Sequence, residues 1–467
     1  MLLLAFGALY ATSLDAYGML GWDESEYASL ARSVARGQGF TISGKPNSLR
    51  PPVLPLAGAA SILVCGGASD RVVRSANLVF ALLALVVVYG FAVRHYDRAT
   101  GLMAASALGL SRTFWVSTPQ FMAEIPFMAF FSAAVLFFYS GVYEEARYFR
   151  WSWLCWGLAL LTRYTAMLFA PLGAGIVLVA LLTGDEGARA RFLSWRFVLA
   201  PMAGVLVVTP WFIREQLTFG DALIGVKQSS MQLQVYMPGV SMPWYFYVDS
   251  IPRMLLVPLT LMLLVGAGWA VWKRDRLALH CLLVVAGIVS WFSCYRYKEV
   301  RMITSTLPFM AVVVAAGTTQ LLAPLRRWRA PVLVALMLAV GAVSYVQSRP
   351  VLETVVSLGY PSFRQALDFA RGHTPPSAVL MGASRPQIYW YTDRQVEDFP
   401  DEAAFTSALE HVDWVVVVNF ERGQKAYVRD LVKRLTRADE QAGDVYVFRD
   451  ARFLTVLIRA ELLRRRL

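Results

Sequence analysis

Residues 21–27 read Gly-Trp-Asp-Glu-Ser-Glu-Tyr and follow directly on an apolar segment, residues 1–20, that is long enough to cross a membrane. A carboxylate is unfavourable in hydrocarbon, by about 2.5–3.5 kcal/mol for Asp at a helix centre on insertion scales. Asp23 and Glu24 are therefore predicted to lie at the membrane interface, or in a wet cavity that opens to it. This acidic pair is a candidate for chemistry at a membrane surface.

The composition is that of an integral membrane protein. Of the 467 residues, 57% are hydrophobic and 16% are charged, and the mean hydropathy is +0.50. Such a chain is too apolar for a soluble globule. The net charge of +12 comes from basic residues scattered over short turns between apolar runs. This pattern indicates topology signals and contacts with lipid headgroups, and argues against nucleic-acid binding.

Apolar runs of spanning length predict an all-α polytopic membrane protein with about 11 transmembrane helices. The first run lacks a basic n-region and a convincing cleavage site, so we interpret it as a retained helix and not as a signal peptide. The predicted spans lie near residues 1–20, 72–93, 99–117, 124–143, 151–162, 165–182, 197–213, 254–272, 277–294, 302–322 and 331–347.

Two stretches of this layout need a separate interpretation. Arg163 separates the spans 151–162 and 165–182, which could instead form one long tilted helix interrupted by this residue. Residues 51–67 are apolar but short, and the two prolines at their start fix the beginning of a helix. We predict a re-entrant or surface helix there.

Compact basic turns, such as residues 94–98 and 326–329, recur between alternate spans. The positive-inside rule places these turns, and with them the N-terminus, in the cytoplasm. Eleven spans then put the end of the chain outside. Residues 1–350 are thus predicted to form a transmembrane catalytic domain with outer-face loops at 21–71 and 214–252, the second of which is expected to cover the site.

The composition changes near residue 352, and residues 351–467 are predicted to form a small soluble α/β domain on the outer face. Its clearest element is a buried strand that reads Trp-Val-Val-Val-Val-Asn at residues 414–419. The other expected elements are helices at 367–371, 403–411 and 425–437, a strand at 378–382 and a final strand at 445–449.

The candidate site residues are charged side chains that fall on the outer face of this layout. Three are acids, Asp23, Glu24 and Glu124, and a charge in or beside a membrane span is a functional hypothesis by default. The others are basic residues of the same predicted outer regions: Lys45, Arg50, Arg163, Lys298 and Arg301.

Acids and cations that face one cavity suit transfer from a phosphate-linked donor. A carboxylate can accept the proton of a hydroxyl that attacks an anomeric carbon, and cations can stabilise the charge that grows on a departing phosphate. Structural interpretations also stay open. Asp23 and Glu24 can be solvated interface residues, Glu124 can complement a helix dipole, and the cations can bind lipid headgroups or snorkel to the interface. The four Cys and four His residues show no metal-ligand spacing.

The order of these features resembles the GT-C superfamily of polyprenyl-phosphate-sugar glycosyltransferases. It is most similar to the branch related to protein O-mannosyltransferases and lipid A aminoarabinose transferases, over roughly residues 15–345. Three positions depart from the family pattern, with Glu124 for the usual Asp, Arg163 for Lys, and Met302 for an aromatic residue. The matching segments are Asp23-Glu24 with Tyr27 and Ala31, Arg50-Pro51-Pro52 with Pro55, Glu124-Ile125-Pro126, Leu161-Thr162-Arg163, and Lys298-Glu299-Val300-Arg301 with Leu307-Pro308.

The resemblance implies a GT-C fold and an inverting glycosyltransferase in the inner (plasma) membrane, which uses a polyprenyl-phosphate-linked sugar at the outer face. The acceptor would be a hydroxyl of a protein, lipid or glycan. Asp23 would be the catalytic base, with Glu24 and Glu124 in the acidic wall, and the five basic residues would hold the donor phosphate. No cofactor is certain, and a divalent metal between Asp23 and Glu124 stays an open alternative. Membrane lipids are the other expected partners.

Three other functions stay open at this point. A transporter or lipid flippase could use the same acids as a proton relay, although the inverted repeats typical of transporters are not evident in the sequence. A membrane scaffold could carry its function in the C-terminal domain. An oligosaccharide transferase that acts on diphosphate-linked glycans would usually have a larger C-terminal domain.

Overall fold

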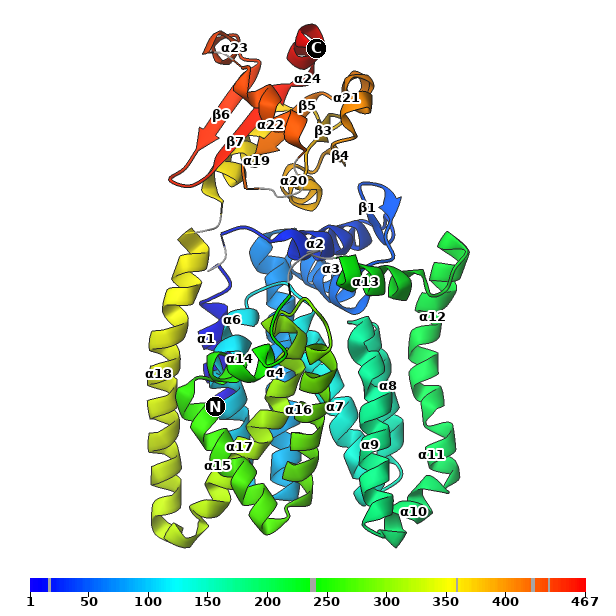
Figure 1. Cartoon of the computed structure of the whole chain (residues 1–467), viewed down its shortest axis with the longest axis vertical. Helices are drawn as coiled ribbons and strands as arrows, with labels where there is room; N and C mark the ends of the chain where they lie inside the picture. Colours follow the sequence, from blue (N-terminus) through cyan, green and yellow to red (C-terminus); the bar gives the residue numbers. More distant parts are fainter. Residues whose placement is uncertain (16–17, 236–240, 358–359, 421–424, 436) are drawn as a thin grey trace. The chain divides into compact units, whose positions relative to one another are not determined.

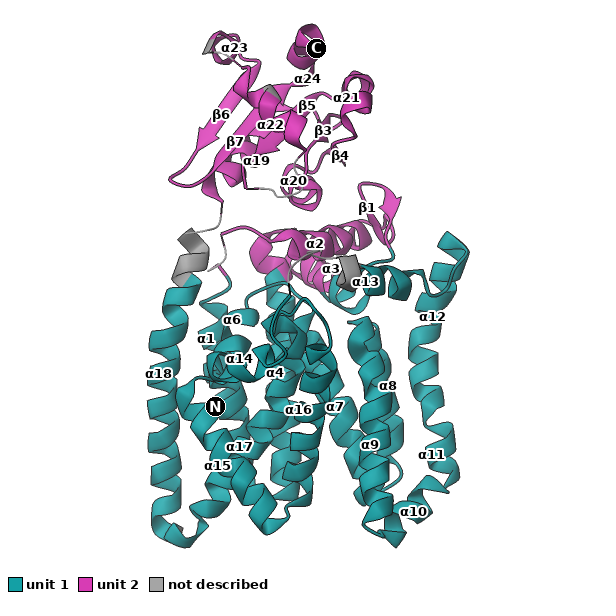
Figure 2. Cartoon of the chain, in the orientation of Figure 1, with its two compact units in different colours: residues 1–14, 48–57, 74–352 teal, residues 15–47, 58–73, 353–467 magenta. Residues whose placement is uncertain are grey.

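The computed structural model describes residues 1–15, 18–235, 241–357, 360–420, 425–435 and 437–467. The chain forms two compact units, each assembled from segments that are distant in the sequence (Figure 2). The C-terminal segment shares its unit with two segments of the first predicted outer loop. The first unit comprises residues 1–14, 48–57 and 74–352, and the second comprises residues 15–47, 58–73 and 353–467.

The first unit is a bundle of helices that run side by side (Figure 1). Among the described residues, seven helical segments are long and apolar enough to cross a membrane, or eight if one bent pair counts as a single span. This confirms the all-α polytopic class. The seven are α4 (Asp70–His95), α7 (Glu124–Tyr143), η1 (Tyr164–Leu168) with α9 (Phe169–Leu182), α11 (Trp195–Leu199) with α12 (Pro201–Phe219), α16 (Arg276–Ser293), η2 (Val300–Thr306) with α17 (Leu307–Leu321), and α18 (Arg329–Ser357).

Three of the predicted spans are too short to cross a membrane alone. Helix α1 (Leu2–Ala11) has 10 residues and α8 (Tyr148–Leu160) has 13, which give about 15 and 20 Å of helix against about 30 Å of hydrocarbon. The predicted span 99–117 is broken at Ser111, whose backbone is extended. Among the described residues, seven or eight continuous segments are long and apolar enough to span, compared with about 11 predicted, because apolar composition does not mark where a helix ends or breaks. The helices on either side of Ser111 are α5 (Arg98–Leu110) and α6 (Arg112–Ser117).

The bent pair consists of α14 (Phe246–Leu255) and α15 (Val257–Lys273), which meet at an angle of 114°. Leu256 joins them with a φ of +84°, which a leucine rarely adopts without support from its surroundings. Leu255 and Leu256 are both buried, so packing holds the bend. The predicted span 254–272 is thus α15 with a sharp turn before it.

Glycine allows α15 and α17 to pack closely. A Cβ atom on Gly317 would lie 2.3 Å from the Cα atom of Gly266, and a Cβ on Gly266 would lie 2.4 Å from the carbonyl oxygen of Val313. Small residues at helix crossings in membranes permit this approach of two backbones. Helix α17 is buried along most of its length, which makes it the centre of the first unit.

The predicted outer loop 214–252 is largely helical. Helix α12 continues to Phe219 and ends at Gly220, which has the left-handed conformation typical of a helix C-cap. Helix α13 (Ile224–Val235) follows, and residues 236–240 lie outside the described part. The short helix expected at residues 51–67 is present as α3 (Val53–Cys65). The remaining helices of this unit are α10 (Glu186–Phe192) and η3 (Ala323–Trp328).

The second unit contains a five-stranded sheet with the order β4-β3-β5-β7-β6. The first three strands are parallel, and β7 pairs antiparallel with both β5 and β6. Every residue of β5 is buried, as its run of four valines predicts for a strand covered on both faces. The strands are β3 (Val379–Met381), β4 (Gln395–Glu397), β5 (Trp414–Val418), β6 (Val445–Arg449) and β7 (Leu454–Arg459).

Helices cover both faces of this sheet. Val415 and Val417 share a buried cluster with Val428 and Leu463, which belong to two helices on one face. Helix α19 (Pro361–His373) packs on β6 and β7, where the Phe369 ring contacts Tyr446. The other helices of this part are α20 (Arg385–Thr392), α21 (Glu402–Ala408), η4 (Leu409–His411), α22 (Ala426–Lys433), α23 (Arg437–Gln441) and α24 (Ala460–Arg466).

The C-terminal α/β class is confirmed, with corrections to its elements. Residues 445–449 are not the last strand, because β7 follows and forms the inner neighbour of β6. The sequence of β7 is a short apolar run, and its periodicity does not separate a buried strand from a buried helix. Helix α20 and strand β4 were not predicted either.

The first predicted outer loop begins with a helix, α2 (Trp22–Ala35), which packs on α20 and on the hairpin of β1 (Thr41–Ile42) and β2 (Lys45–Pro46). The acidic cluster was expected where the first membrane helix ends. Helix α1 instead ends at Ala11, and Asp23 and Glu24 lie in the first turn of α2.

Candidate active site

The two acids of α2 lie in its first turn, where the positive end of the helix dipole stabilises a carboxylate. Glu24 is buried, and its Oε2 accepts a hydrogen bond from the backbone N–H of Gly21 at 2.8 Å. This contact satisfies a backbone donor just before the helix, so Glu24 acts as a capping residue. Asp23 is half-buried on the same turn. Their predicted catalytic roles stay predictions.

Glu124 begins α7, and its side chain is 6% exposed. Arg163 donates from Nη1 to Glu124 Oε1 at 2.6 Å. The other oxygen, Oε2, is buried and has no hydrogen-bond partner among the described residues. One predicted acid and one predicted phosphate ligand are thus direct partners across 39 residues of sequence.

Arg163 lies at a break between two helices. Its backbone N–H donates to the carbonyl of Ala159, in the last turn of α8, and its extended backbone precedes η1. The alternative of one long helix through residues 151–182 is therefore wrong. The break lets the side chain reach α7, because a continuous helix would not offer an extended residue at this point.

Two hydrogen bonds bring the segment around Arg50 to the segment around Arg163. The backbone N–H of Val53 donates to the carbonyl of Leu161 at 3.0 Å. On the other side of Arg50, the Tyr164 hydroxyl donates to the carbonyl of Ser48 at 3.4 Å. Because both flanks of Arg50 are tied to both flanks of Arg163, the two predicted phosphate ligands belong to one local structure.

Helix α13 packs on the same segment. The Ser48 hydroxyl donates to Gln228 Oε1 at 2.8 Å. A Cβ atom on Gly225 would lie 2.4 Å from both the Ser48 carbonyl oxygen and the Tyr164 hydroxyl. Only glycine fits here without a shift of its neighbours, so the first helix after α12 is seated directly beside the Arg50 segment.

The two remaining cations of the first unit are engaged with nearby groups. Lys298 is 3% exposed and donates from Nζ to the backbone carbonyls of Met242 and Tyr295. Arg301, in η2, forms an ion pair with Glu299. Segment η2 packs against α7, the helix that Glu124 begins. The structure thus gives Lys298 a role in holding its loop, and binding of a phosphate by Lys298 and Arg301 stays a prediction.

Lys45 lies on the β1–β2 hairpin, where its side chain is exposed. It belongs to the second unit together with Asp23 and Glu24, whereas the other five candidates belong to the first. A common cavity that contains Asp23 and Glu124 therefore stays a prediction.

The chemistry of the acids bears on the open question of a metal ion. Among the described residues, no group of three or more His, Cys, Asp or Glu side chains is close enough together to hold a metal. In the described part of the first unit, one oxygen of Glu124 has no hydrogen-bond partner, and Arg163 donates to the other. A donor set of this kind does not make a metal site by itself, and a bridge from Glu124 to Asp23 stays a prediction.

The structure adds polar residues that the sequence analysis did not select. Trp211 donates from Nε1 to the Tyr164 hydroxyl at 3.2 Å. Glu215 is 1% exposed and forms an ion pair with the neighbouring Arg214. The signal that could have identified Glu215 and Arg214 is that they form an Arg-Glu pair at the end of a predicted span, where an isolated charge is unfavourable.

A family model described as dolichyl-phosphate-mannose-protein mannosyltransferase matches residues 49–213, which contain Arg50, Glu124 and Arg163. The chain is also similar to GPI mannosyltransferase 3 of Yarrowia lipolytica, with 26% identity over 343 residues. That match covers 70% of this chain and 63% of the relative, so the chain spans less than two thirds of the relative's length.

The fold is similar to that of solved structures over nearly the whole chain. ArnT from Cupriavidus metallidurans bound to undecaprenyl phosphate has a TM-score of 0.74 and 16% identity, with 98% of this chain and 97% of that chain covered. The chain therefore has an ArnT-like GT-C fold. The oligosaccharyltransferase of Archaeoglobus fulgidus tethered with an acceptor peptide is more distant, with a TM-score of 0.56, 11% identity, and coverage of 89% of this chain and 69% of that chain.

These similarities confirm the resemblance to GT-C glycosyltransferases that the order of the motifs predicted. The family match begins one residue before Arg50 and ends at residue 213. Three of the candidate residues lie inside the match, as do the Arg163–Glu124 and Val53–Leu161 contacts. Asp23, Glu24, Lys45, Lys298 and Arg301 lie outside it.

Proposed function

We propose that this chain is a multi-pass membrane glycosyltransferase that moves a sugar from a polyprenyl-phosphate-linked donor to an acceptor hydroxyl. The observation that carries this proposal is the local structure around Arg163, which pairs with the buried carboxylate of Glu124. The residues that flank Arg163 are hydrogen-bonded to the residues that flank Arg50. A mannosyltransferase family model covers these three residues. The ArnT structure, which is similar over nearly the whole of this chain, was solved with bound undecaprenyl phosphate.

The proposed reaction requires cations beside the phosphate on which negative charge develops. As the bond between the anomeric carbon and the phosphate oxygen breaks, negative charge grows on the departing polyprenyl phosphate. Arg50 and Arg163 would stabilise this charge through charge-assisted hydrogen bonds, which are stronger than neutral ones. Guanidinium groups suit the task because their planar donors match phosphate oxygens.

The acceptor hydroxyl would attack the anomeric carbon from the face opposite the leaving phosphate, so the configuration at that carbon inverts. Its proton would pass to the carboxylate of Asp23, which acts as a general base. The products are the glycosylated acceptor, the polyprenyl phosphate and a protonated Asp23, which loses its proton to water. The proposed location is the outer face of the plasma membrane.

Glu124 would act on the donor site through Arg163. The 2.6 Å hydrogen bond fixes the orientation of the guanidinium group, and a positioned donor does not have to reorganise during the reaction. The same ion pair reduces the unfavourable effect of burying either charge alone. Glu124 thus supports the cationic side of the site in this proposal.

The test uses the purified full chain in detergent with undecaprenyl-phosphate-linked sugars, starting with mannose. We expect release of undecaprenyl phosphate and transfer of labelled sugar to an extract of cell envelopes. Arg50→Ala should lower kcat/KM for the donor about tenfold to hundredfold, because a hydrogen bond to a charged group is worth about 1.5–3 kcal/mol.

Arg253→Ala is the matched control, because Arg253 forms an exposed ion pair with Asp249 within α14. This variant should keep donor kcat/KM within about twofold, as expected for a weak surface pair. An Arg50→Ala variant with unchanged donor kcat/KM would contradict the phosphate role. Accumulation of a lipid or solute in proteoliposomes, with no glycosyl transfer from any donor tested, would favour a transporter.

A further inference from the structure

Helix α2, which carries Asp23 and Glu24, is held at its beginning by the C-terminal segment of the second unit. The backbone N–H of Leu20, just before α2, donates to the hydroxyl of Tyr391 at 2.6 Å. The same hydroxyl donates to Asp70 Oδ2 at 2.7 Å. Asp70 Oδ1 accepts a second bond from Trp390 Nε1 at 2.8 Å. Tyr391 and Trp390 both belong to α20, so one helix fixes the chain three residues before Asp23.

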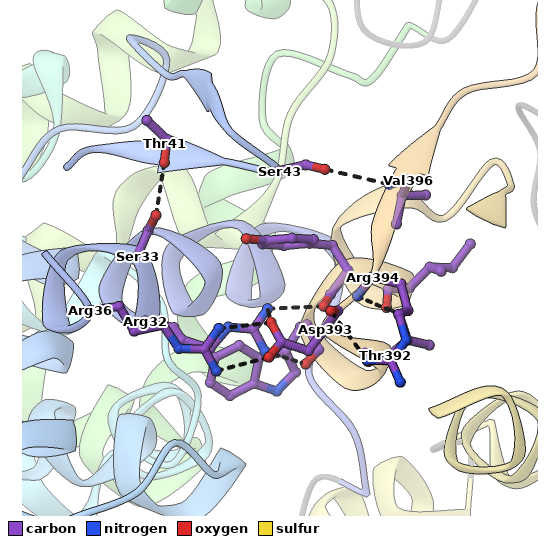
Figure 3. Close-up of polar contacts among 12 residues, drawn as sticks. Arg32, Ser33, Arg36, Thr41, Ser43, Thr392, Asp393, Arg394 and Val396 are labelled. Carbon is purple, nitrogen blue, oxygen red and sulfur yellow. Dashed lines mark hydrogen bonds and ion pairs between the residues drawn. The ribbon is translucent and has the colours of Figure 1, made fainter. Parts of the chain in front are cut away.

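The last turn of α2 is held by the same helix (Figure 3). Arg32 donates to the backbone carbonyls of Trp390 at 2.8 Å and Tyr389 at 2.9 Å. It also lies 3.3 Å from the carboxylate of Asp393. Arg36, one turn further on, makes two hydrogen bonds to Asp393, at 3.0 and 2.8 Å.

Burial makes this second attachment strong. The side chain of Arg32 is 7% exposed, and its guanidinium carbon lies 4.9 Å from the ring centroids of both Tyr389 and Trp390. Loss of Arg32 would leave two carbonyls and a carboxylate without this donor, and removing one partner of a buried charged network is strongly unfavourable. Arg36 is half-exposed and adds a weaker, bidentate pair.

The position of Asp393 suits this role. Asp393 ends α20 with a φ of +57°, in the left-handed region. Aspartate and asparagine adopt this conformation more readily than most residues. The next residue, Arg394, ties the end of α20 to the end of α19 through hydrogen bonds to Thr374 Oγ1 at 3.2 Å and its carbonyl at 2.8 Å. The acceptor that α2 uses is therefore itself fixed in place.

The hairpin that follows α2 makes a further contact of the same kind. The Ser33 and Thr41 hydroxyls share a hydrogen bond of 2.8 Å between α2 and β1. The Ser43 hydroxyl accepts from the backbone N–H of Val396, in β4, at 3.4 Å. Figure 3 shows these contacts on either side of the Arg32–Asp393 group. The Ser33–Thr41 contact binds α2 to the hairpin, and the Ser43–Val396 contact binds the hairpin to the C-terminal sheet.

We propose that α20 positions the catalytic helix α2, so that the C-terminal segment acts as a clamp that sets the placement of Asp23 and does not itself touch the reacting groups. We name the set Arg32, Arg36, Asp70, Tyr391 and Asp393 the α2 clamp. The proposal rests on the proposed function, because it takes Asp23 to be the base. The physical reason is that a displacement of about 1 Å in a reacting group can lower turnover about a hundredfold.

Two variants test the clamp with little effect on folding. Asp393→Asn removes the charge and keeps a residue that tolerates the left-handed conformation. Tyr391→Phe removes one hydroxyl and keeps the ring, which lies under Arg364 at 4.1 Å. We expect each variant to lower kcat for the mannose donor about tenfold, with donor KM within about twofold. Hydrogen exchange of the α2 amides should become faster.

Asp398→Asn is the matched control, since Asp398 pairs with Arg385 at the other end of α20 and is exposed. It should leave both kcat and α2 exchange unchanged. Because kcat is expressed per folded molecule, a merely stabilising role would lower the melting temperature and leave kcat unchanged. Unchanged kcat in both clamp variants, whether or not α2 exchange is faster, would overturn the proposal.

Asp23→Asn, measured alongside, separates the two hypotheses. If this variant keeps full turnover, the assignment of the base fails, and faster α2 exchange in the clamp variants would then report an attachment without a catalytic role. If Asp23→Asn is inactive while the double variant Tyr391→Phe/Asp393→Asn turns over like the wild type, the clamp alone is overturned.

Discussion

The beginnings of α2 and α7 are alike in sequence and different in structure. Glu24 and Glu124 both lie in the first turn of a helix, and both are about 5–6% exposed. Glu24 accepts from the backbone N–H of Gly21, three residues away. Glu124 accepts from the side chain of Arg163, which is 39 residues away, and its second oxygen has no partner among the described residues.

The difference teaches that an acid at a helix N-terminus does not reveal its role by its position. A carboxylate there is favourable for dipole and capping reasons whether or not it takes part in chemistry. The group that pairs with the carboxylate is more informative about its role. Glu24 accepts from the backbone at the start of its own helix, and its catalytic role stays a prediction. Glu124 pairs with a distant cation and is part of a charged structure that includes the Arg50 segment.

The largest expected effect concerns Asp23, the neighbour of Glu24 on α2. Asp23→Asn should lower kcat about a hundredfold to ten-thousandfold, because it removes an oriented general base. Glu24→Gln should stay within about threefold, since its side-chain oxygen can still accept from Gly21. Donor turnover by purified enzyme measures both. A Glu24→Gln variant as inactive as Asp23→Asn would show that Glu24 is more than a cap.

The next effect distinguishes Glu124 from Glu24 directly. Glu124→Gln keeps a hydrogen-bond acceptor but removes the charge that faces Arg163, so we expect kcat/KM for the donor to fall about tenfold. The same substitution at Glu24 is the matched control. Equal donor kcat/KM in the Glu124→Gln and Glu24→Gln variants would show that Glu124 has no greater role in donor use than Glu24.

A smaller effect is expected where α13 meets the Arg50 segment. Gly225→Ala would place a methyl group 2.4 Å from the Ser48 carbonyl oxygen, so the segment must shift and donor KM should rise severalfold. Gly268→Ala is the control, because a Cβ there meets nothing within 4 Å and alanine favours the helix by about 1 kcal/mol. Donor KM unchanged in Gly225→Ala would separate α13 from donor binding.

The smallest effect is a pH dependence of the clamp. Burial alone would raise the pKa of Asp393, but the hydrogen bond from Arg36 and the charges of Arg32, Arg36 and Arg371 outweigh it and hold the pKa below its ordinary value. A lowered pKa in the folded state means that the stabilisation is complete above the unfolded value, about 3.9, and is lost as the pH falls through the folded value.

Hydrogen exchange of α2 checks this sign. The wild type should be better protected than Asp393→Asn at neutral pH, and the difference should shrink as the pH falls below about 4. Because both proteins are compared at the same pH, the intrinsic pH dependence of exchange cancels. A difference that grows on acidification would contradict the assignment of the ion pairs to Asp393.

Local patterns predicted much of the fold correctly. Apolar runs located seven of the spanning helices, and the valine run located β5. These signals are local, because the periodicity of buried positions and a continuous apolar stretch can both be recognised within a few consecutive residues. The same runs do not mark helix ends, since α1 and α8 are apolar but have only 10 and 13 residues. β7 was missed because a short apolar run does not identify its own secondary structure.

The candidate site divides in the same way. The residue types came from the sequence, because charges beside membrane spans are rare enough to be selected. The interaction partners of these residues could not be predicted from the sequence. The contact from Tyr164 to Ser48 joins residues 116 positions apart, and the one from Arg36 to Asp393 joins residues 357 apart. Such pairs depend on the path of every loop between them, which no local pattern records.

By itself, the sequence determined that this protein is a polytopic membrane protein with acids and cations beside its spans, since hydropathy and charge are properties of each residue. The order of these residues supplied a resemblance to GT-C glycosyltransferases. The tertiary structure decided that Glu124 pairs with Arg163, that Glu24 caps its own helix, and that the C-terminal segment shares a unit with α2. The physical reason is that a hydrogen bond or an ion pair requires two groups within about 3 Å, and only the folded chain sets that distance.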